Sequence, residues 1–121
     1  MGIIIREVSS KNDLKKFVKF PFTIYKGNKY WVPQIIADEI KSLMPEHNPA
    51  FKHCKAKFWI AFDDKTVVGR IGAIINYDYN KKTGQNIGRF SRFECINNIE
   101  VAALLFQTAE QWLKNEKMDL V

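Results

Sequence analysis

The chain has 121 residues, of which 46% are hydrophobic and 26% are charged. This length supports one hydrophobic core and is too short for two, so we expect a single domain over residues 1–121. The short apolar run Ile3–Ile5 is interrupted by Arg6 and Glu7, so we expect neither a signal peptide nor a membrane span there and predict a cytoplasmic protein.

The positive charge is concentrated in the first half. Residues 1–60 contain 11 Lys and Arg against 5 Asp and Glu, whereas residues 61–121 contain 8 of each. The lysines are scattered and form no recognisable nucleic-acid-binding motif, so a small anionic ligand or a solvated face is favoured over nucleic acid. Cys54 and Cys95 lie too far apart for a local motif, which favours reduced thiols.

The first half begins as strand, helix and helix. The β-branched run Ile3–Val8 predicts a strand. Ser10 is placed to cap a helix over residues 12–25, and Pro21 is expected to kink or split that helix near Lys19. A turn over residues 26–29 leads to a second helix that enters at Trp31-Val32-Pro33 and closes at Pro45.

A β-hairpin follows an irregular connection. Residues 45–57 are rich in Pro, His, Asn and Lys, with at most one helical turn near residues 50–53. Residues 57–62 and 66–75 read as antiparallel strands joined by a tight turn, and Gly69 and Gly72 inside the second strand indicate a bulge or a close backbone approach. The polar stretch 76–86 is expected to be a loop, in which Tyr77 and Tyr79 anchor the chain.

The last part is a strand that feeds a long helix. Residues 87–96 predict the strand, Asn97-Asn98 the turn, and Glu100 to Lys117 an amphipathic helix. Its apolar stripe comprises Ala102, Leu105, Phe106, Ala109, Trp112 and Leu113. Residues 119–121 look like the start of another strand. A helix start after a strand offers unpaired N–H groups and a positive dipole end to an anion.

The element order carries a resemblance to a known superfamily. The predicted fold is α/β (α+β), with the order β-α-α-β-β-β-α-(β) and a mostly antiparallel sheet covered by helices. This order resembles the first part of the GNAT acyl-CoA N-acyltransferase fold. The segments KFPFTIYKGNKYWVPQ, VVGRIGAIIN, FECI and AEQWLK are also similar to uncharacterised bacterial GNAT-like proteins. The resemblance implies a domain that stops where a fifth strand would begin, with the missing wall supplied by further sequence or by a partner chain.

The resemblance also implies a reaction and a site. GNAT proteins transfer an acyl group from acyl-CoA, commonly acetyl-CoA, to an amine. The pantetheine arm would lie along the fourth strand and the pyrophosphate at the start of the following helix. The implied cofactor-binding residues, mainly through their backbone, are Phe93, Cys95, Ile96, Asn97, Asn98, Ile99, Glu100, Val101 and Ala102.

The helix start departs from the family pattern R/Q-x-x-G-x-G/A. Only Ala102 matches, because Asn97 replaces the Arg or Gln and Glu100 replaces the first Gly. With Asn97 at the N-cap and Glu100 at the third helical position, their side chains would occupy the free N–H donors, and the carboxylate would repel a second anion. A self-capped helix and a degenerate CoA site therefore both stay open.

Candidate catalytic groups are few. Glu94 is the weak candidate for a general base that deprotonates the amine, and the alternative is an ion pair with Arg92 on the same strand. Cys95 reads as a small buried apolar residue. His47, His53 and Cys54 fit no usual ligand spacing, so no metal site is expected.

A second function class also stays open. The chain could be a catalytically silent GNAT-like binding module. Such a module could form a homodimer through the edge of the 87–96 strand and the 98–117 helix, since unpaired strand edges and apolar patches seek cover.

Overall fold

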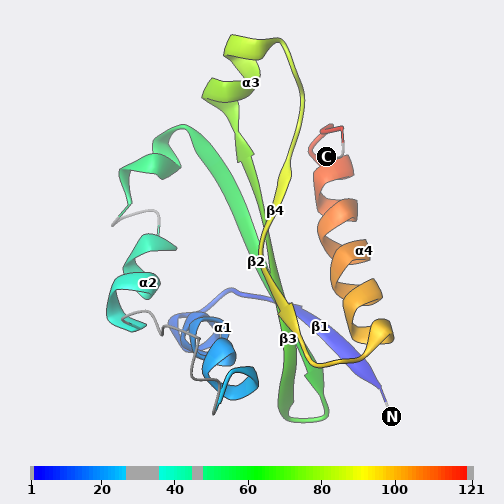
Figure 1. The fold of residues 1–121 in the computed structure, drawn as a ribbon. Helices are drawn as coiled ribbons and strands as arrows, with labels where there is room; N and C mark the ends of the chain where they lie inside the picture. The colour runs from blue at the N-terminus through cyan, green and yellow to red at the C-terminus, as the bar shows by residue number, and fades with distance from the viewer. Residues whose placement is uncertain (1, 27–35, 45–47, 120–121) are drawn as a thin grey trace.

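The computed structural model describes residues 2–26, 36–44 and 48–119. Its centre is a four-stranded antiparallel sheet with the order β1-β2-β3-β4 (Figure 1). The strands are β1 (Ile3–Glu7), β2 (Cys54–Asp63), β3 (Thr66–Asn76) and β4 (Arg89–Cys95). The strands therefore follow one another in the sheet in the same order as along the chain.

Helices cover both faces of the sheet. α1 (Lys11–Ile24), α2 (Ile36–Ser42) and the 3₁₀ helix η1 (Pro49–Lys52) lie on one side, and α4 (Ile99–Asn115) lies on the other (Figure 1). α3 (Tyr77–Thr83) projects at one end of the sheet, between β3 and β4. The domain is thus built in three layers.

The alternation of side chains along β2 explains the two cores. Trp59 and Ala61 face α4, whereas Phe58, Ile60 and Phe62 face α1. Since both faces of the strand are buried, its sequence is a continuous apolar run rather than an alternating one. The core under α4 contains Val68, Ile71, Ala73 and Ile75 of β3 with Val101, Leu105, Ala109 and Leu113 of the helix, and the core under α1 contains Leu14, Phe17, Val18 and Leu43.

Several local predictions are confirmed. Ser10 caps α1, and its Oγ accepts a hydrogen bond from the Asp13 N–H at 3.0 Å. Asp63 pairs with Thr66 to close the β2–β3 hairpin, with Asp64 in the left-handed region at φ 58°. Asp119, the last described residue, forms a parallel bridge with Ile87, as a further strand beside β4 would begin.

Both interior glycines of β3 lie beside a bulge, as predicted, but the atoms that approach them belong to side chains rather than to another backbone. A Cβ at Gly69 would lie 2.8 Å from Cδ1 of Leu105, and one at Gly72 would lie 2.7 Å from the Ser91 Oγ. The pairing of β3 with β4 also shifts register between Arg70 and Gly72. Glycine at these positions therefore lets α4 and β4 pack against the strand.

Other predictions are wrong or fall outside the described residues. α1 runs to Ile24 with Pro21 inside it, so Pro21 does not split the helix, and the alternative of a kink near Lys19 stays a prediction. The stretch predicted as a loop contains α3, because Asn76 caps its start by accepting from the Tyr79 N–H and Gly84 ends it at φ 70°. The predicted helix entry at Trp31-Val32-Pro33 and the stop at Pro45 lie outside the described ranges, and α2 is seen from Ile36.

Candidate functional site

β4 contains a bulge where it pairs with β3. Glu94 pairs with Arg70 and Ser91 pairs with Gly72, so Arg92 and Phe93 together lie opposite the single residue Ile71. Arg92 has φ 50°, a left-handed conformation that costs a residue with a Cβ about 1–2 kcal/mol. Glycine usually takes this position in a bulge, and strain of this kind is often found at functional sites.

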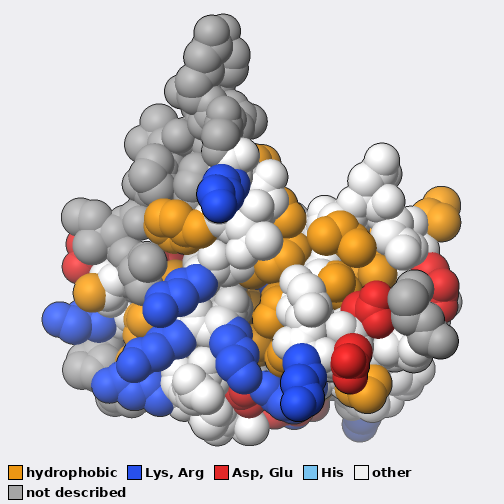
Figure 2. All heavy atoms as spheres, turned by 90° about the horizontal axis from the view of Figure 1, so that it is seen from below, with side chains coloured by type: hydrophobic (Ala, Val, Ile, Leu, Met, Phe, Trp, Pro, Cys, Tyr) orange, Lys and Arg blue, Asp and Glu red, His pale blue; other side chains and the backbone are white. Residues whose placement is uncertain are grey.

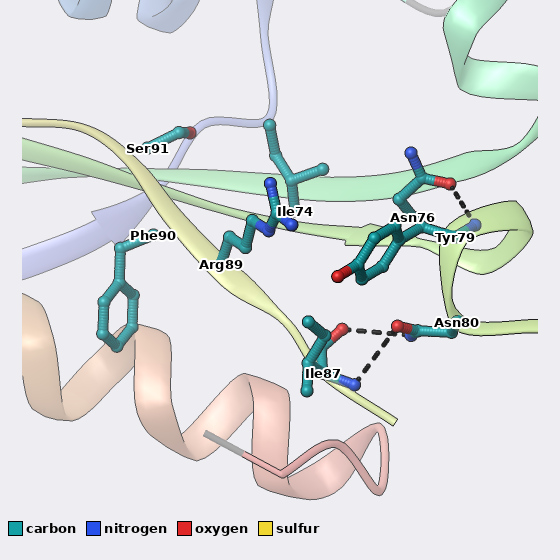
Figure 3. A pocket seen from close by; sticks show the side chains of 8 residues that line it. All are labelled: Ile74, Asn76, Tyr79, Asn80, Ile87, Arg89, Phe90 and Ser91. Carbon is teal, nitrogen blue, oxygen red and sulfur yellow. Dashed lines mark hydrogen bonds between the residues drawn. The ribbon is translucent and has the colours of Figure 1, made fainter. Parts of the chain in front are cut away.

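The bulge decides which face Glu94 occupies. The rings of Phe90 and Phe93 both pack on Phe106 of α4, with centroids 5.1 and 4.4 Å from it, although an unbroken strand would place residues three apart on opposite faces. Ser91 points away from α4 (Figure 3). The extra residue thereby turns Glu94 toward the α1 side, rather than into the apolar core under α4.

Glu94 forms a buried ion pair with Arg70 on β3. The Arg70 Nη2 donates to the Glu94 Oε1 at 2.8 Å, and the two side chains are 7% and 17% exposed. The Arg70 Nη1 donates to the main-chain oxygen of Phe17 at 2.8 Å, and its guanidinium carbon lies 4.8 Å from the centre of the Phe17 ring. Burial lowers the pKa of Arg70, which the charge of Glu94 opposes.

Tyr25, at the C-terminal cap of α1, also acts on this carboxylate. A hydrogen bond to Glu94, together with the negative charge of that carboxylate, raises the pKa of the Tyr25 hydroxyl. Tyr25 therefore stays protonated at neutral pH and serves as a donor.

The predicted ion pair between Arg92 and Glu94 is wrong. Arg92 instead donates from Nε to the Glu39 Oε1 of α2 at 2.6 Å. Arg70 lies opposite Glu94 on the neighbouring strand β3 and takes its carboxylate, while Glu39 of α2 takes the Arg92 side chain. Glu94 thus forms an ion pair, as the sequence suggested, but its partner is Arg70 rather than Arg92.

The outer edge of β4 carries main-chain groups that β3 does not use. The Ile96 N–H donates to the Val68 oxygen at 2.9 Å, so the Ile96–Val68 pair faces inward. In an antiparallel ladder the next residue then faces outward, which directs the N–H and C=O of Cys95 away from β3. Among the described residues, strand pairing on this side of β4 is limited to the bridge between Ile87 and Asp119.

The start of α4 follows this edge directly. Its N-cap is Asn98 rather than the predicted Asn97, and the Asn98 Oδ1 accepts from the N–H groups of Glu100 at 2.9 Å and Val101 at 3.4 Å. The Asn98 N–H donates to the Ile96 oxygen at 2.7 Å. Ile99 is 88% exposed. The helix start is therefore partly self-capped and carries an acidic side chain in its first turn.

Two neighbouring cavities share Ile74 in their walls. One cavity, of 260 Å³, lies between α3 and β4 (Figure 3). In its wall the guanidinium carbon of Arg89 lies 5.1 Å from the centre of the Tyr79 ring, and the Asn80 side-chain amide forms hydrogen bonds with the main-chain N–H and oxygen of Ile87. The other, of 210 Å³, is mostly apolar and has Arg92 in its wall. Its lining further includes Leu43, Phe51, Ala56 and Phe58.

Other candidate groups do not assemble into a site within the described ranges. No group of three or more His, Cys, Asp or Glu side chains is suitable for a metal there; His53 instead pairs with Asp78, Nδ1 to Oδ2 at 3.1 Å, and His47 is not described. Burial raises the pKa of the Cys95 thiol. No helix in the described part of the chain has the length and apolar character needed to cross a membrane.

Sequence reasoning missed Arg70, Tyr25 and the main-chain oxygen of Phe17. One signal was available for Arg70, because an arginine within the buried run VVGRIGAII must find a partner for its charge. The other two contacts depend on how α1 lies against the sheet.

Comparison with known proteins shows the fold. No family model matches the chain. A solved tandem GNAT protein from the clavulanic acid biosynthesis pathway matches with a TM-score of 0.71 and 13% identity, over 95% of this chain and 34% of that one. The chain therefore has a partial GNAT-like fold, as the sequence resemblance implies.

Two curated proteins are similar in sequence. Protein YghO of Escherichia coli (strain K12) is 33% identical over 93% of this chain and 29% of its own length. The bacterial ceramide synthase of Caulobacter vibrioides (strain NA1000 / CB15N) is 28% identical over 88% of this chain and 28% of its own length. The chain thus spans less than a third of the length of these two curated relatives.

Proposed function

We propose that this chain forms part of an acyltransferase that transfers an acyl group from acyl-CoA to an amine, with Glu94 as the general base. The observation that carries the proposal is the bulge in β4. It presents a carboxylate on one face of a strand that ends at a helix start and whose outer side, among the described residues, has no strand partner beyond the Ile87–Asp119 bridge. An acyltransferase of this kind requires a base and a hydrogen-bonding edge close to each other.

The outer edge of β4 fits an extended ligand that carries amides. The free N–H and C=O of Cys95, and the neighbouring main chain of Phe93, would pair with the pantetheine arm as a further strand does. The helix start fits a pyrophosphate less well, because Asn98 already occupies two donors and Glu100 adds a negative charge. We therefore propose that the strand edge contributes most of the affinity and the helix start contributes less.

The proposed chemistry needs one base. An amine reacts only after losing a proton, which passes to Glu94 directly or through a water molecule. The neutral amine nitrogen then forms a bond to the thioester carbonyl carbon and the carbon–sulfur bond breaks. The proton that the attacking nitrogen loses as it becomes an amide passes to the CoA sulfur, so CoA leaves as a thiol. Arg70 and Tyr25 hold the Glu94 carboxylate, so that few of its orientations are available.

For the acceptor we propose a long-chain amine. One curated relative is called a bacterial ceramide synthase, and a ceramide is an amide of a long-chain amino alcohol. The mostly apolar cavity of 210 Å³ lies on the same sheet face as Glu94 and could hold part of an alkyl chain.

The test uses the complete gene product. Purified protein is mixed with palmitoyl-CoA or acetyl-CoA and with sphinganine or octylamine, and released CoA thiol is measured. Glu94→Gln should reduce kcat by about 100-fold or more, the usual effect of removing a general base. Glu110→Gln, a carboxylate of α4 remote from β4 in sequence, serves as the matched control and should leave kcat unchanged. Absence of CoA release, together with no rise of the melting temperature with either acyl-CoA, would refute the proposal.

A binding module is the second candidate, and the surface beside β4 supports it. Ile96 and Ile99, where β4 leads into α4, are 38% and 88% exposed. Apolar side chains beside an open edge are typical of surfaces that pair with another chain. If the chain is a binding module, light scattering should give the molar mass of a dimer, and Ile99→Glu should reduce it to that of a monomer. CoA should change neither mass.

A further inference from the structure

One face of α1 is directed at the ion pair of Glu94. Phe17, Pro21 and Tyr25 are spaced four residues apart, which places them on one side of the helix. Phe17 and Pro21 are buried, and the Tyr25 N–H donates to the Pro21 oxygen at 2.9 Å. The same face therefore reaches Arg70 at one end and Glu94 at the other.

Pro21 explains why the Phe17 oxygen is available to a side chain. In an uninterrupted helix this oxygen accepts from the N–H four residues later, which is that of residue 21. Proline has no N–H, and its ring pushes the carbonyl four residues earlier away from the helix axis. The released oxygen accepts from the Arg70 Nη1 at 2.8 Å instead.

This second acceptor fixes the plane of the guanidinium. Nη1 binds the Phe17 oxygen, Nη2 binds the Glu94 Oε1, and the guanidinium carbon lies over the Phe17 ring. Because the donors of an arginine form a rigid fork, two acceptors on different elements determine its orientation. The position of the Glu94 carboxylate follows from the position of Arg70.

We propose that Pro21 is a positioning residue for Glu94: by withholding an N–H from the Phe17 oxygen, it frees that oxygen to orient Arg70, which holds the carboxylate for proton transfer. The catalytic part of this inference rests on the proposed role of Glu94 as the base. The charged or titratable groups that act on the Arg70–Glu94 pair are Arg92 of β4 and Glu39 of α2, through their charges on Arg70, and Tyr25 after α1, through its hydrogen bond to Glu94.

The rival account treats Pro21 only as a buried packing residue. Pro21→Ala separates the two, because alanine restores the N–H and is the best helix former, so the variant should fold. We measure the rotation and proton exchange of the Arg70 guanidinium by NMR on the full-length protein. Exchange should become about tenfold faster, as expected when a charge-assisted hydrogen bond is lost. Lys19→Ala, an exposed change on the same helix, should not alter it.

The kinetic arm tests whether Pro21 acts through Arg70. With palmitoyl-CoA and sphinganine, Pro21→Ala should lower kcat by about tenfold with the KM for palmitoyl-CoA unchanged, because a misplaced base slows chemistry without weakening binding. Arg70→Lys keeps the charge but loses the fork, so it should lower kcat similarly. In the Arg70→Lys background, Pro21→Ala should have no additional effect.

The outcomes are distinct. Faster Arg70 exchange in Pro21→Ala and the non-additive double variant support the proposal. Unchanged exchange, or a kcat loss that adds fully to that of Arg70→Lys, overturns it. If the native protein transfers no acyl group to any amine tested, the proposed function fails, and the exchange of Arg70 alone decides whether Pro21 holds the ion pair. Pro21→Ser, which also supplies an N–H, must give the same exchange result as Pro21→Ala.

Discussion

Removing the cap of α4 should lower stability and improve CoA binding at the same time. Asn98→Ala releases the N–H groups of Glu100 and Val101, which the Asn98 Oδ1 now occupies. Loss of such a cap costs about 1 kcal/mol. For 121 residues the unfolding entropy is roughly 0.25 kcal/mol per kelvin, so the melting temperature should fall by about 4 °C.

The ligand should reverse part of this loss. If the phosphates of acyl-CoA bind at the start of α4, the two released N–H groups can donate to them. CoA should then raise the melting temperature of Asn98→Ala by more than it raises the melting temperature of the native protein. Glu100→Gln removes the carboxylate that repels the phosphates. A charge at a helix N-terminus contributes about 0.3–1 kcal/mol, so CoA affinity should rise about two- to fivefold. Glu110→Gln, further along the same helix, is the matched control.

The assay is a thermal melt over a CoA titration at low salt, followed by calorimetry. Weaker or unchanged CoA binding in both Asn98→Ala and Glu100→Gln would refute the placement of the phosphates at α4. The strand edge of β4 would then have to supply the affinity by itself.

Three further predictions concern stability and pH, and the first two are checked by urea unfolding. Arg92→Gly and Arg92→Ala both lose the ion pair with Glu39, but only alanine keeps the strain of φ 50°, so the glycine variant should be more stable by about 1 kcal/mol. Gly88→Ala should cost about 1–3 kcal/mol, because its Cβ would overlap Leu113. The pKa of the Tyr25 hydroxyl is raised in the folded protein above its ordinary value of 10.0. Above pH 10 the unfolded chain therefore loses this proton before the folded protein does, so the free energy of unfolding falls as the pH rises through the folded pKa. Tyr25→Phe should therefore reduce the loss of unfolding free energy above pH 10, as measured by alkaline titration of the melting temperature.

α1 carries several exposed lysines. Lysines 11, 15, 16 and 19 of α1 are exposed, and Figure 2 shows Lys and Arg side chains gathered on one side of the molecule when it is viewed from below. Their charge would attract anionic ligands over a distance of about one Debye length, so CoA binding should weaken as salt is raised.

Local patterns in the sequence determined many features of this protein. Ser10 before Asp13, the hairpin closed at Asp63 and Thr66, and the stripe through Leu105 on α4 each depend on residues close together in the chain. Short-range hydrogen bonds and the periods of helix and strand are sufficient for such features. The Asn76 and Gly84 signals of α3 are also local, but the polar composition between them favours a loop.

The tertiary structure alone decided the partners at the site. Glu94 meets Arg70 on the α1 side because an extra residue in β4 shifts the register, and a one-residue shift exchanges the faces of every side chain beyond it. Phe17 and Arg70 are 53 residues apart, and their hydrogen bond exists only because α1 lies across β3. Sequence spacing carries no information about such a contact, since it depends on how separate elements pack together.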